Sequence, residues 1–215
     1  MSETMRAARA NMIEAQIRSA DVTDPRIHAA MAAVEREKFV PGSRQALAYA
    51  DVPVEVAHGR YLLDPRSLAK ALQLAEVRES DHALDVGCGT GYSSAVLGRL
   101  VKSVVALEQD ADLVRIASHA LENAQGDIEV TQGSLIDGFK MSGPYDLILV
   151  NGSIETRPES LLEQLAEGGR LVCFMSQEGR AMLFVREHGQ VGSRPGFDAT
   201  VPTLAGFKNA MGFIF

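Results

Sequence analysis

The stretch that decides the fold is ALDVGCGTGY, residues 83–92, in which an apolar run ends at Val86 and glycines follow at alternate positions. These glycines are Gly87, Gly89 and Gly91, and a pattern with helical spacing follows them. Glycine lets the backbone turn sharply and approach a ligand, because no Cβ stands in the way. In a doubly wound sheet, this kind of turn between a strand and a helix is where ligands bind. The stretch therefore predicts an open α/β sheet with a ligand site at its carboxyl edge.

The spacing of the glycines and the charge beside them indicate which ligand the turn accepts. The dinucleotide fingerprint G-x-G-x-x-G has its third glycine three positions after the second, whereas Gly91 follows Gly89 by two and Tyr92 stands where that pattern has glycine. The P-loop pattern is not found in this turn either. Asp85 comes two residues before Gly87, and its carboxylate would repel a pyrophosphate but attract a sulfonium and an α-amino group. S-adenosylmethionine carries both groups, so the turn predicts this cofactor.

Residues near the turn and after the next two expected strands complete the predicted cofactor site. Glu108 ends the second strand, where a carboxylate can accept both ribose hydroxyls of an adenosine, and Gln109 follows it. Ser134 lies in the turn after the third strand, where it binds the exocyclic amine of the adenine or satisfies its own backbone. For Asp85 the alternative role is to hold the glycine loop together by hydrogen bonds. Cys88 is expected to be a small residue that fits the loop.

Strand and helix patterns alternate from His82 onward. This alternation predicts βαβ units, and hence a mostly parallel sheet with helices on both faces. The last two expected strands have no long helix between them, so we expect them to pair antiparallel at one edge. The predicted elements are seven strands, at 82–87, 103–107, 128–132, 146–151, 170–175, 181–187 and 209–215, and helices at 92–100, 111–123 and 159–165.

Residues 1–80 have a different pattern, which predicts a helical and loop extension packed on a methyltransferase core of residues 81–215 within one structural domain. Apolar residues near the N-terminus recur at helical spacing. Asp24 and Asp64 each precede a proline, which is typical of an N-cap followed by the first helical residue. Residues 39–59 combine turn residues with short apolar runs and predict a loop with brief strands.

The composition excludes several classes of protein. The chain has 215 residues, of which 46% are hydrophobic and 23% charged, as in globular proteins with a substantial core. Its net charge is −7 and its basic residues do not cluster, so no nucleic-acid partner is expected. No apolar stretch approaches the roughly 20 residues that span a bilayer, and the N-terminal residues contain no apolar signal core. We therefore expect no membrane partner and a cytoplasmic location. The scattered cysteines and histidines predict neither a disulfide nor a metal site.

Seven segments distributed along the chain carry a family resemblance: MIEAQIR (12–18), REKFVP (36–41), AYADVPVEV (48–56), LDVGCGTGY (84–92), ALE (106–108), PYDLILVNGSI (144–154) and LLEQLAEGGRLV (161–172). Through them the chain resembles the protein-L-isoaspartate O-methyltransferase family over nearly its whole length. Such enzymes use S-adenosylmethionine to methylate the stray α-carboxylate of an isoaspartyl residue, and the ester then closes to a succinimide. The resemblance thus implies a protein-repair enzyme whose partner is a protein or peptide carrying isoaspartyl residues.

The chain departs from the family pattern in the segment before the third expected helix. Family members carry Thr-Ile-Ser-x-Pro, whose hydroxyls contact the substrate carboxylate, whereas Tyr61 stands here at the threonine position and Leu63 at the serine position. We expect Tyr61, Leu62 and Leu63 to line the substrate pocket. The catalytic residue stays unassigned, with Tyr61 as a candidate substitute for the missing hydroxyl. Arg60 and Arg66 are candidate clamps for the carboxylate, although a solvated surface charge is the simpler interpretation of each.

A second departure is Ser134, where the family usually has an aspartate against the adenosine. Two alternatives to a repair enzyme therefore stay open. One is a diverged methyltransferase for another carboxylate or hydroxyl compound, and the other is a module that binds S-adenosylmethionine or its demethylated product without turnover. The intact pattern of Asp85, three glycines and Glu108 favours an enzyme. Residues 197–207 are expected to complete the substrate pocket.

Overall fold

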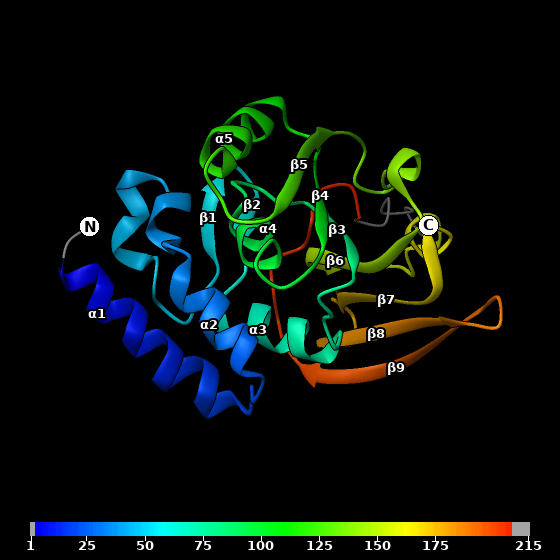
Figure 1. Ribbon diagram of the computed structural model, residues 1–215, viewed down its shortest axis with the longest axis horizontal. Coiled ribbons are helices and arrows are strands. Elements are labelled where there is room, and N and C mark those ends of the chain that lie inside the picture. The colour runs from blue at the N-terminus through cyan, green and yellow to red at the C-terminus, as the bar shows by residue number, and fades with distance from the viewer. Residues whose placement is uncertain (1–2, 208–215) are drawn as a thin grey trace, which may run out of the picture.

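A sheet of seven strands forms the centre of the protein in the computed structural model, which describes residues 3–207 (Figure 1). The first five of these strands along the chain run parallel, and the last two pair antiparallel at one edge. This confirms the predicted doubly wound, mostly parallel sheet. Across the sheet the order is β5 (Asp127–Gln132), β4 (Ser103–Glu108), β3 (His82–Val86), β6 (Tyr145–Ile154), β7 (Leu165–Met175), β8 (Arg180–Glu187) and β9 (Gln190–Asp198).

The strand order creates a topological switch point beside β3. The chain moves from β3 outward through β4 to β5, then returns to place β6 on the other side of β3 and continues to β7. The connections after β3 and β6 therefore leave in opposite directions. In open α/β sheets, ligands bind outside the carboxyl ends of the strands at such a point. The topology thus puts the glycine turn, which follows β3, at the expected place for a ligand.

Helices cover both faces of the sheet, because successive strand residues point to opposite faces and both sets are apolar. Ala83 belongs to one buried cluster and its neighbour Leu84 to the other. The predicted helices are present but each ends two or three residues earlier than expected. After α4, Gly98 packs so closely on the next loop that a Cβ would lie 2.6 Å from the Gln125 carbonyl oxygen. These helices are α4 (Tyr92–Leu97), α5 (Ala111–Leu121) and α6 (Glu159–Leu162), with a short 3-10 turn η5 (Lys140–Ser142) before β6.

The N-terminal part supplies helices and a small second sheet. Asp24 accepts a hydrogen bond from the Arg26 amide at 2.8 Å and Asp64 from the Ser67 amide at 2.8 Å, which confirms both predicted N-caps. Strands β1 and β2 pair antiparallel beside the main sheet. The elements are α1 (Glu3–Met12), η1 (Ile13–Ile17), η2 (Arg18–Ala20), α2 (Pro25–Ala33), η3 (Arg36–Phe39), η4 (Gly42–Leu47), β1 (Val54–Ala57), β2 (Arg60–Leu62) and α3 (Pro65–Leu74).

The N-terminal helices pack on one face of the sheet and share its core. Met12 of α1 and Ile27 of α2 lie in the same buried cluster as Val96 of α4. Figure 1 shows α1 and α2 on the side of the molecule away from the hairpin of β8 and β9. The division into an extension of residues 1–80 and a core of residues 81–215 stays a prediction, since a shared core is compatible with either description.

The seventh strand of the described sheet is β9, which the sequence pattern does not predict. The strand predicted at 209–215 lies outside the described residues, and β9 pairs with β8. His188 and Gly189 between these strands both have positive φ, at 52° and 75°, as the favoured two-residue hairpin turn requires. The sequence of β9 contains glycines and Pro195 and little apolar alternation, so its pattern does not predict a strand. An edge strand nevertheless tolerates proline.

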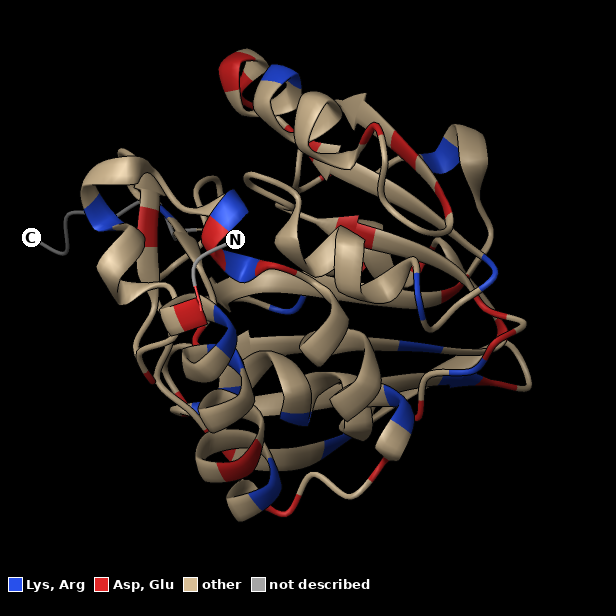
Figure 2. Ribbon diagram, turned by 60° about the vertical axis from the view of Figure 1, so that its left-hand side comes forward, with Lys and Arg blue, Asp and Glu red and all other residues tan. Residues whose placement is uncertain are grey.

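Charged residues of both signs are interspersed along the ribbon (Figure 2). Most of the described ion pairs join exposed side chains, such as Arg115 and Asp112, and pairs of this kind contribute little to stability. Within residues 3–207, two pairs are buried on both sides, namely Arg170–Asp81 and Arg60–Glu108. No helix in this range is both long and apolar enough to cross a membrane.

Candidate functional site

The glycine turn lies at the switch point, over the ends of β3 and β4. Gly87, Gly89 and Gly91 have φ values of 74°, 58° and 97°, which other residues adopt only with strain. The turn is fixed to β4 because the amides of Gly87 and Cys88 donate to the Leu107 carbonyl oxygen at 2.9 and 3.1 Å. The three glycines are therefore required by the backbone itself.

Asp85 is fully buried beneath the turn and uses both of its carboxylate oxygens within the fold. Oδ2 accepts from the hydroxyls of Ser93 and Ser94 at 2.6 and 2.5 Å. Oδ1 accepts from Nδ2 of Asn151 at 2.6 Å. Burial raises the pKa of the Asp85 carboxyl, and these three hydrogen bonds oppose the rise. Asp85 thus ties α4 and β6 to β3, the alternative role that the sequence left open, and its contact with a cofactor stays a prediction.

Glu108 ends β4 with its side chain fully buried against the turn. Its Oε1 accepts from the amides of Gln109 and Asp110 at 2.8 and 3.2 Å. Its Oε2 accepts from the Gly89 amide at 3.0 Å and from the guanidinium of Arg60. The carboxylate predicted to bind a ribose therefore lies beside the glycine turn and already accepts from four donors.

Arg60 comes from β2 and lies inside the site. Its Nη2 forms the ion pair with Glu108, and it lies 3.2 Å from where a Cβ on Gly87 would be. Its Nη1 is buried and has no hydrogen-bond partner within residues 3–207. The interpretation of Arg60 as a solvated surface charge is wrong, because the residue is only 6% exposed. For Arg66 that interpretation is confirmed, since its side chain is 53% exposed and lies 3.6 Å from an Asp51 oxygen.

Residues 201–207 cross the carboxyl edge of the sheet above the turn. Ser153 of β6 accepts a hydrogen bond from the Leu204 amide at 2.9 Å, and Ser153 and Thr203 form a parallel bridge. This pairing directs the Leu204 side chain onto Gly87, where Cδ1 would lie 2.8 Å from an added Cβ. Leu204 therefore covers the side of the turn that glycine leaves open.

The predicted substrate residues lie beside the turn, but little space remains between them and it. Tyr61, Leu62 and Leu63 line a cavity of about 10 Å³ together with Gly87 and neighbouring residues. A cavity of this size holds about one water molecule, whereas pockets for small-molecule ligands start at roughly 300 Å³. Tyr61 is half-buried, and Leu62 and Leu63 are buried. Side chains of the protein itself thus leave little space between the glycine turn and the predicted substrate residues.

The remaining predicted cofactor residues lie around this centre. Gln109 and Ser134 are exposed at the ends of β4 and β5, and the Ser134 hydroxyl accepts from the Asp137 amide at 3.4 Å, as in a self-satisfied turn. Cys88 is buried in the loop, and burial raises the pKa of its thiol well above the usual value, so the thiol is protonated at neutral pH. Sequence reasoning missed Asn151, although a polar residue inside the apolar run of β6 at the switch point is a usable signal.

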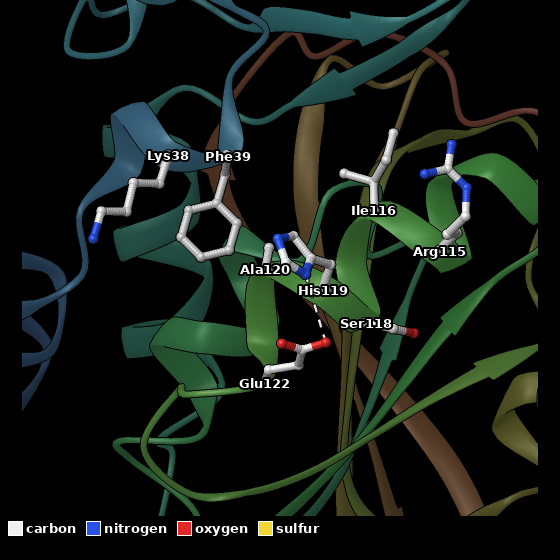
Figure 3. Close-up of a pocket in the computed structure, with 8 residues that line it drawn as sticks. All are labelled: Lys38, Phe39, Arg115, Ile116, Ser118, His119, Ala120 and Glu122. Atoms are coloured by element: carbon white, nitrogen blue, oxygen red, sulfur yellow. Dashed lines mark ion pairs between the residues drawn. The ribbon is translucent and has the colours of Figure 1, made fainter.

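A wider hollow, of about 900 Å³, lies elsewhere on the surface, between η3 and α5 (Figure 3). In Figure 3, Phe39 and Ile116 stand among exposed charged side chains, and His119 pairs with Glu122 at 3.5 Å. The side chains of this pair are 85% and 63% exposed, so water screens them. The hollow contains none of the predicted site residues, and we base no function on it.

The sequence matches one protein family along most of its length. The model of the Protein-L-isoaspartate(D-aspartate) O-methyltransferase family matches residues 7–196. The chain belongs to this family. Among curated family members, the Protein-L-isoaspartate O-methyltransferase of Koribacter versatilis is 38% identical over 181 residues, which are 83% of this chain and 82% of the relative. The one from Aeropyrum pernix is 38% identical over 176 residues, covering 80% of this chain and 68% of the relative.

Solved structures of the family share the fold. A protein-L-isoaspartate O-methyltransferase with 24% sequence identity superposes with a TM-score of 0.79, covering 92% of this chain and 66% of that one. A second, from Plasmodium falciparum and crystallised with S-adenosyl-L-homocysteine, has 22% identity and a TM-score of 0.74, covering 93% and 97%. These likenesses confirm the Rossmann-like methyltransferase fold.

Proposed function

We propose that the chain is an S-adenosylmethionine-dependent protein carboxyl methyltransferase of the protein-L-isoaspartate type, acting in protein repair. The observation that carries the proposal is the family match over residues 7–196, supported by curated relatives 38% identical over about four fifths of both chains. The glycine turn and Glu108 at the switch point agree with it. We place the enzyme in the cytoplasm and expect proteins or peptides with isoaspartyl residues, rather than nucleic acid or membrane, as its partners.

The donor set around the turn fits a nucleoside cofactor chemically, although the space is filled in this conformation. Glu108 is the acceptor for the ribose hydroxyls, and the Gly87–Gly91 backbone is the surface on which the cofactor would lie, with Cys88 filling the loop. Gln109 and Ser134 flank the adenosine side, and Asp85 is the nearby anion. When bound, S-adenosylmethionine supplies a methyl group on a sulfonium, which is a good leaving group.

The residues of the chain have mainly a positioning role in the proposed reaction. A carboxylate has a pKa of about 4 and is already ionised at neutral pH, so the acceptor needs no general base. The Tyr61 hydroxyl is the candidate donor that orients the substrate carboxylate in place of the family serine. Leu62 and Leu63 form an apolar wall that excludes water. Bringing the reacting atoms into line is a large part of such catalysis.

A single assay tests the proposal. The protein is incubated with S-adenosylmethionine labelled in its methyl group and with an isoaspartyl peptide or its aspartyl counterpart. Base-labile label on the isoaspartyl peptide alone supports repair, whereas label only on another carboxylate or hydroxyl compound would favour a diverged methyltransferase. Cofactor binding without transfer to any acceptor would favour a non-catalytic module, which Leu63 in place of the serine keeps as the second candidate.

Two variants sharpen the assay. Leu63→Ser restores the family hydroxyl and is expected to raise kcat/KM for the isoaspartyl peptide several-fold, because a donor to the carboxylate returns. Tyr61→Phe removes only a hydroxyl and is expected to lower it by about tenfold, the value of one hydrogen bond to a charged group. If Tyr61→Phe leaves kcat/KM unchanged, Tyr61 is not the substitute.

A further inference from the structure

We propose that the cofactor crevice is held closed by the chain's own Arg60 and Leu204, and that both side chains must leave it before S-adenosylmethionine or S-adenosylhomocysteine binds. The inference rests on the proposed function, because it concerns the crevice assigned there to the cofactor. It follows from three features of the described residues: the hydrogen bonds of Glu108, the cover on Gly87, and the incomplete pairing of Arg60.

The hydrogen bonds of Glu108 leave no acceptor site for a ribose. A carboxylate has about four lone-pair sites, two on each oxygen. Two amides use those of Oε1, while the Gly89 amide and Arg60 use those of Oε2. The three amides belong to the backbone around the turn and are fixed. Arg60 is the one donor on a long side chain from another element, so a ribose hydroxyl gains an acceptor only when Arg60 departs.

The side chains of Leu204 and Arg60 lie over Gly87, where the cofactor is expected to pass close to the backbone. Leu204 Cδ1 and Cδ2 lie 2.8 and 3.2 Å from the Cβ position of Gly87, and Arg60 Nη2 lies 3.2 Å from it. The glycine leaves room for close approach, and these two side chains use that room. On the side of the turn that faces Tyr61 and Leu63, the remaining cavity of about 10 Å³ holds about one water molecule.

The incomplete pairing of Arg60 indicates that its position is exchangeable. Nη1 is buried without a partner within residues 3–207, and a buried donor in that state is costly. Its strand, β2, has three residues and is held in a two-stranded sheet with a register irregularity between Glu55 and Ala57. Leaving Glu108 therefore frees Arg60 from an environment that satisfies it only in part.

Calorimetric titration with S-adenosylhomocysteine tests the closure in five proteins, one of which is the double variant Arg60→Met/Leu204→Ala. Arg60→Met keeps the apolar stem but removes the charge, and Leu204→Ala shortens the cover; the wild type and Arg66→Met, a surface arginine of the same chemistry, are the controls. We expect each crevice variant to lower Kd at least about tenfold, which corresponds to a closed form that outnumbers the open one by about ten to one. Arg66→Met should match the wild type within about twofold.

Each other outcome contradicts a defined part of the account. If either crevice variant binds the compound no more tightly than the wild type, the closure is wrong while the cofactor assignment stands. If neither the two crevice variants nor their double variant binds the compound, the proposed cofactor fails and the closure fails with it. Circular dichroism confirms that each variant is folded, and since the two substitutions act on different elements, either one alone is a sufficient test.

Discussion

The two buried arginine–carboxylate pairs lie at opposite ends of the parallel strands. They differ in how many of the arginine nitrogens have a hydrogen-bond acceptor. Arg170 and Asp81 lie at the amino end of the parallel strands, where Nη1 and Nη2 each reach one Asp81 oxygen, at 3.0 and 2.7 Å. Arg170 also donates to three backbone carbonyl oxygens, which belong to Ala75, Glu76 and Asp146. At the carboxyl end, Arg60 reaches Glu108 through Nη2, and Nη1 has no partner in the described part of the chain.

This difference in bonding indicates that Arg170–Asp81 stabilises the fold, whereas Arg60–Glu108 occupies the proposed cofactor site. Every donor group of Arg170 that faces the interior has an acceptor, so its charge is stabilised in one place. Arg60 is bonded to the carboxylate that we predict from its sequence position to bind a ribose, and only one of its two terminal nitrogens, Nη2, makes that contact. Similar burial of two ion pairs therefore does not imply a similar role.

The largest expected effect is that of breaking the fully bonded pair. Arg170→Met leaves Asp81 ionised and buried, so we expect the free energy of unfolding to fall by about 3–5 kcal/mol. Urea denaturation followed by circular dichroism measures it. S-adenosylhomocysteine affinity of the folded fraction should be unchanged, because the pair is remote from the glycine turn. A loss below about 1 kcal/mol would mean that the complete bonding of Arg170 contributes little.

A smaller loss is expected from the same substitution at the other edge. Arg60→Met leaves Glu108 with three backbone amide donors and removes a buried donor without a partner, so the free energy of unfolding should fall by only about 1–2 kcal/mol. The same urea experiment compares the two variants directly. Equal losses for Arg60→Met and Arg170→Met would remove the distinction between a structural and an exchangeable pair.

Asp85 adds a pH test at the carboxyl edge. Burial raises its pKa, so the contribution of this group to stability is complete below the pKa of the unfolded chain and is lost as pH rises through the folded value. Asp85→Asn carries no charge at any pH. The free energy of unfolding of the wild type should therefore fall relative to that of the variant as pH rises from about 4 toward neutrality. Urea titrations at several pH values measure both proteins. If the free energies of unfolding of wild type and Asp85→Asn differ by the same amount over this range, the pKa of Asp85 is not raised by burial.

The smallest expected effect concerns the two cysteines. Burial raises the pKa of both thiols. Cys173 lies within β7, which pairs with strands on both sides, whereas Cys88 lies in the glycine loop next to the Arg60–Glu108 pair. A disulfide reagent should therefore modify Cys88 several-fold faster than Cys173 in the native protein, because the loop opens without global unfolding. Mass spectrometry of partly modified protein identifies the site. Simultaneous modification of both would show that the carboxyl edge opens only when the whole protein unfolds.

The features that the sequence predicts correctly depend on neighbours along the chain. Asp24 and Asp64 cap helices through amides two and three residues away, and the glycine turn follows its strand directly. The positions of Arg60 and Leu204 could not be predicted, because each reaches the turn from a distant element and their contacts exist only in the folded protein. The edge strand β9 was missed for a related reason, since its pairing with β8 compensates for a sequence with little strand character.

Crystallisation of the protein with S-adenosylhomocysteine tests the central claim most directly. The account predicts that a ribose hydroxyl lies on Glu108, that Arg60 has left this carboxylate, and that Leu204 no longer covers Gly87. A structure in which Arg60 and Leu204 keep their places while the compound binds elsewhere, or in which both remain and the compound occupies the turn beside them, would contradict it.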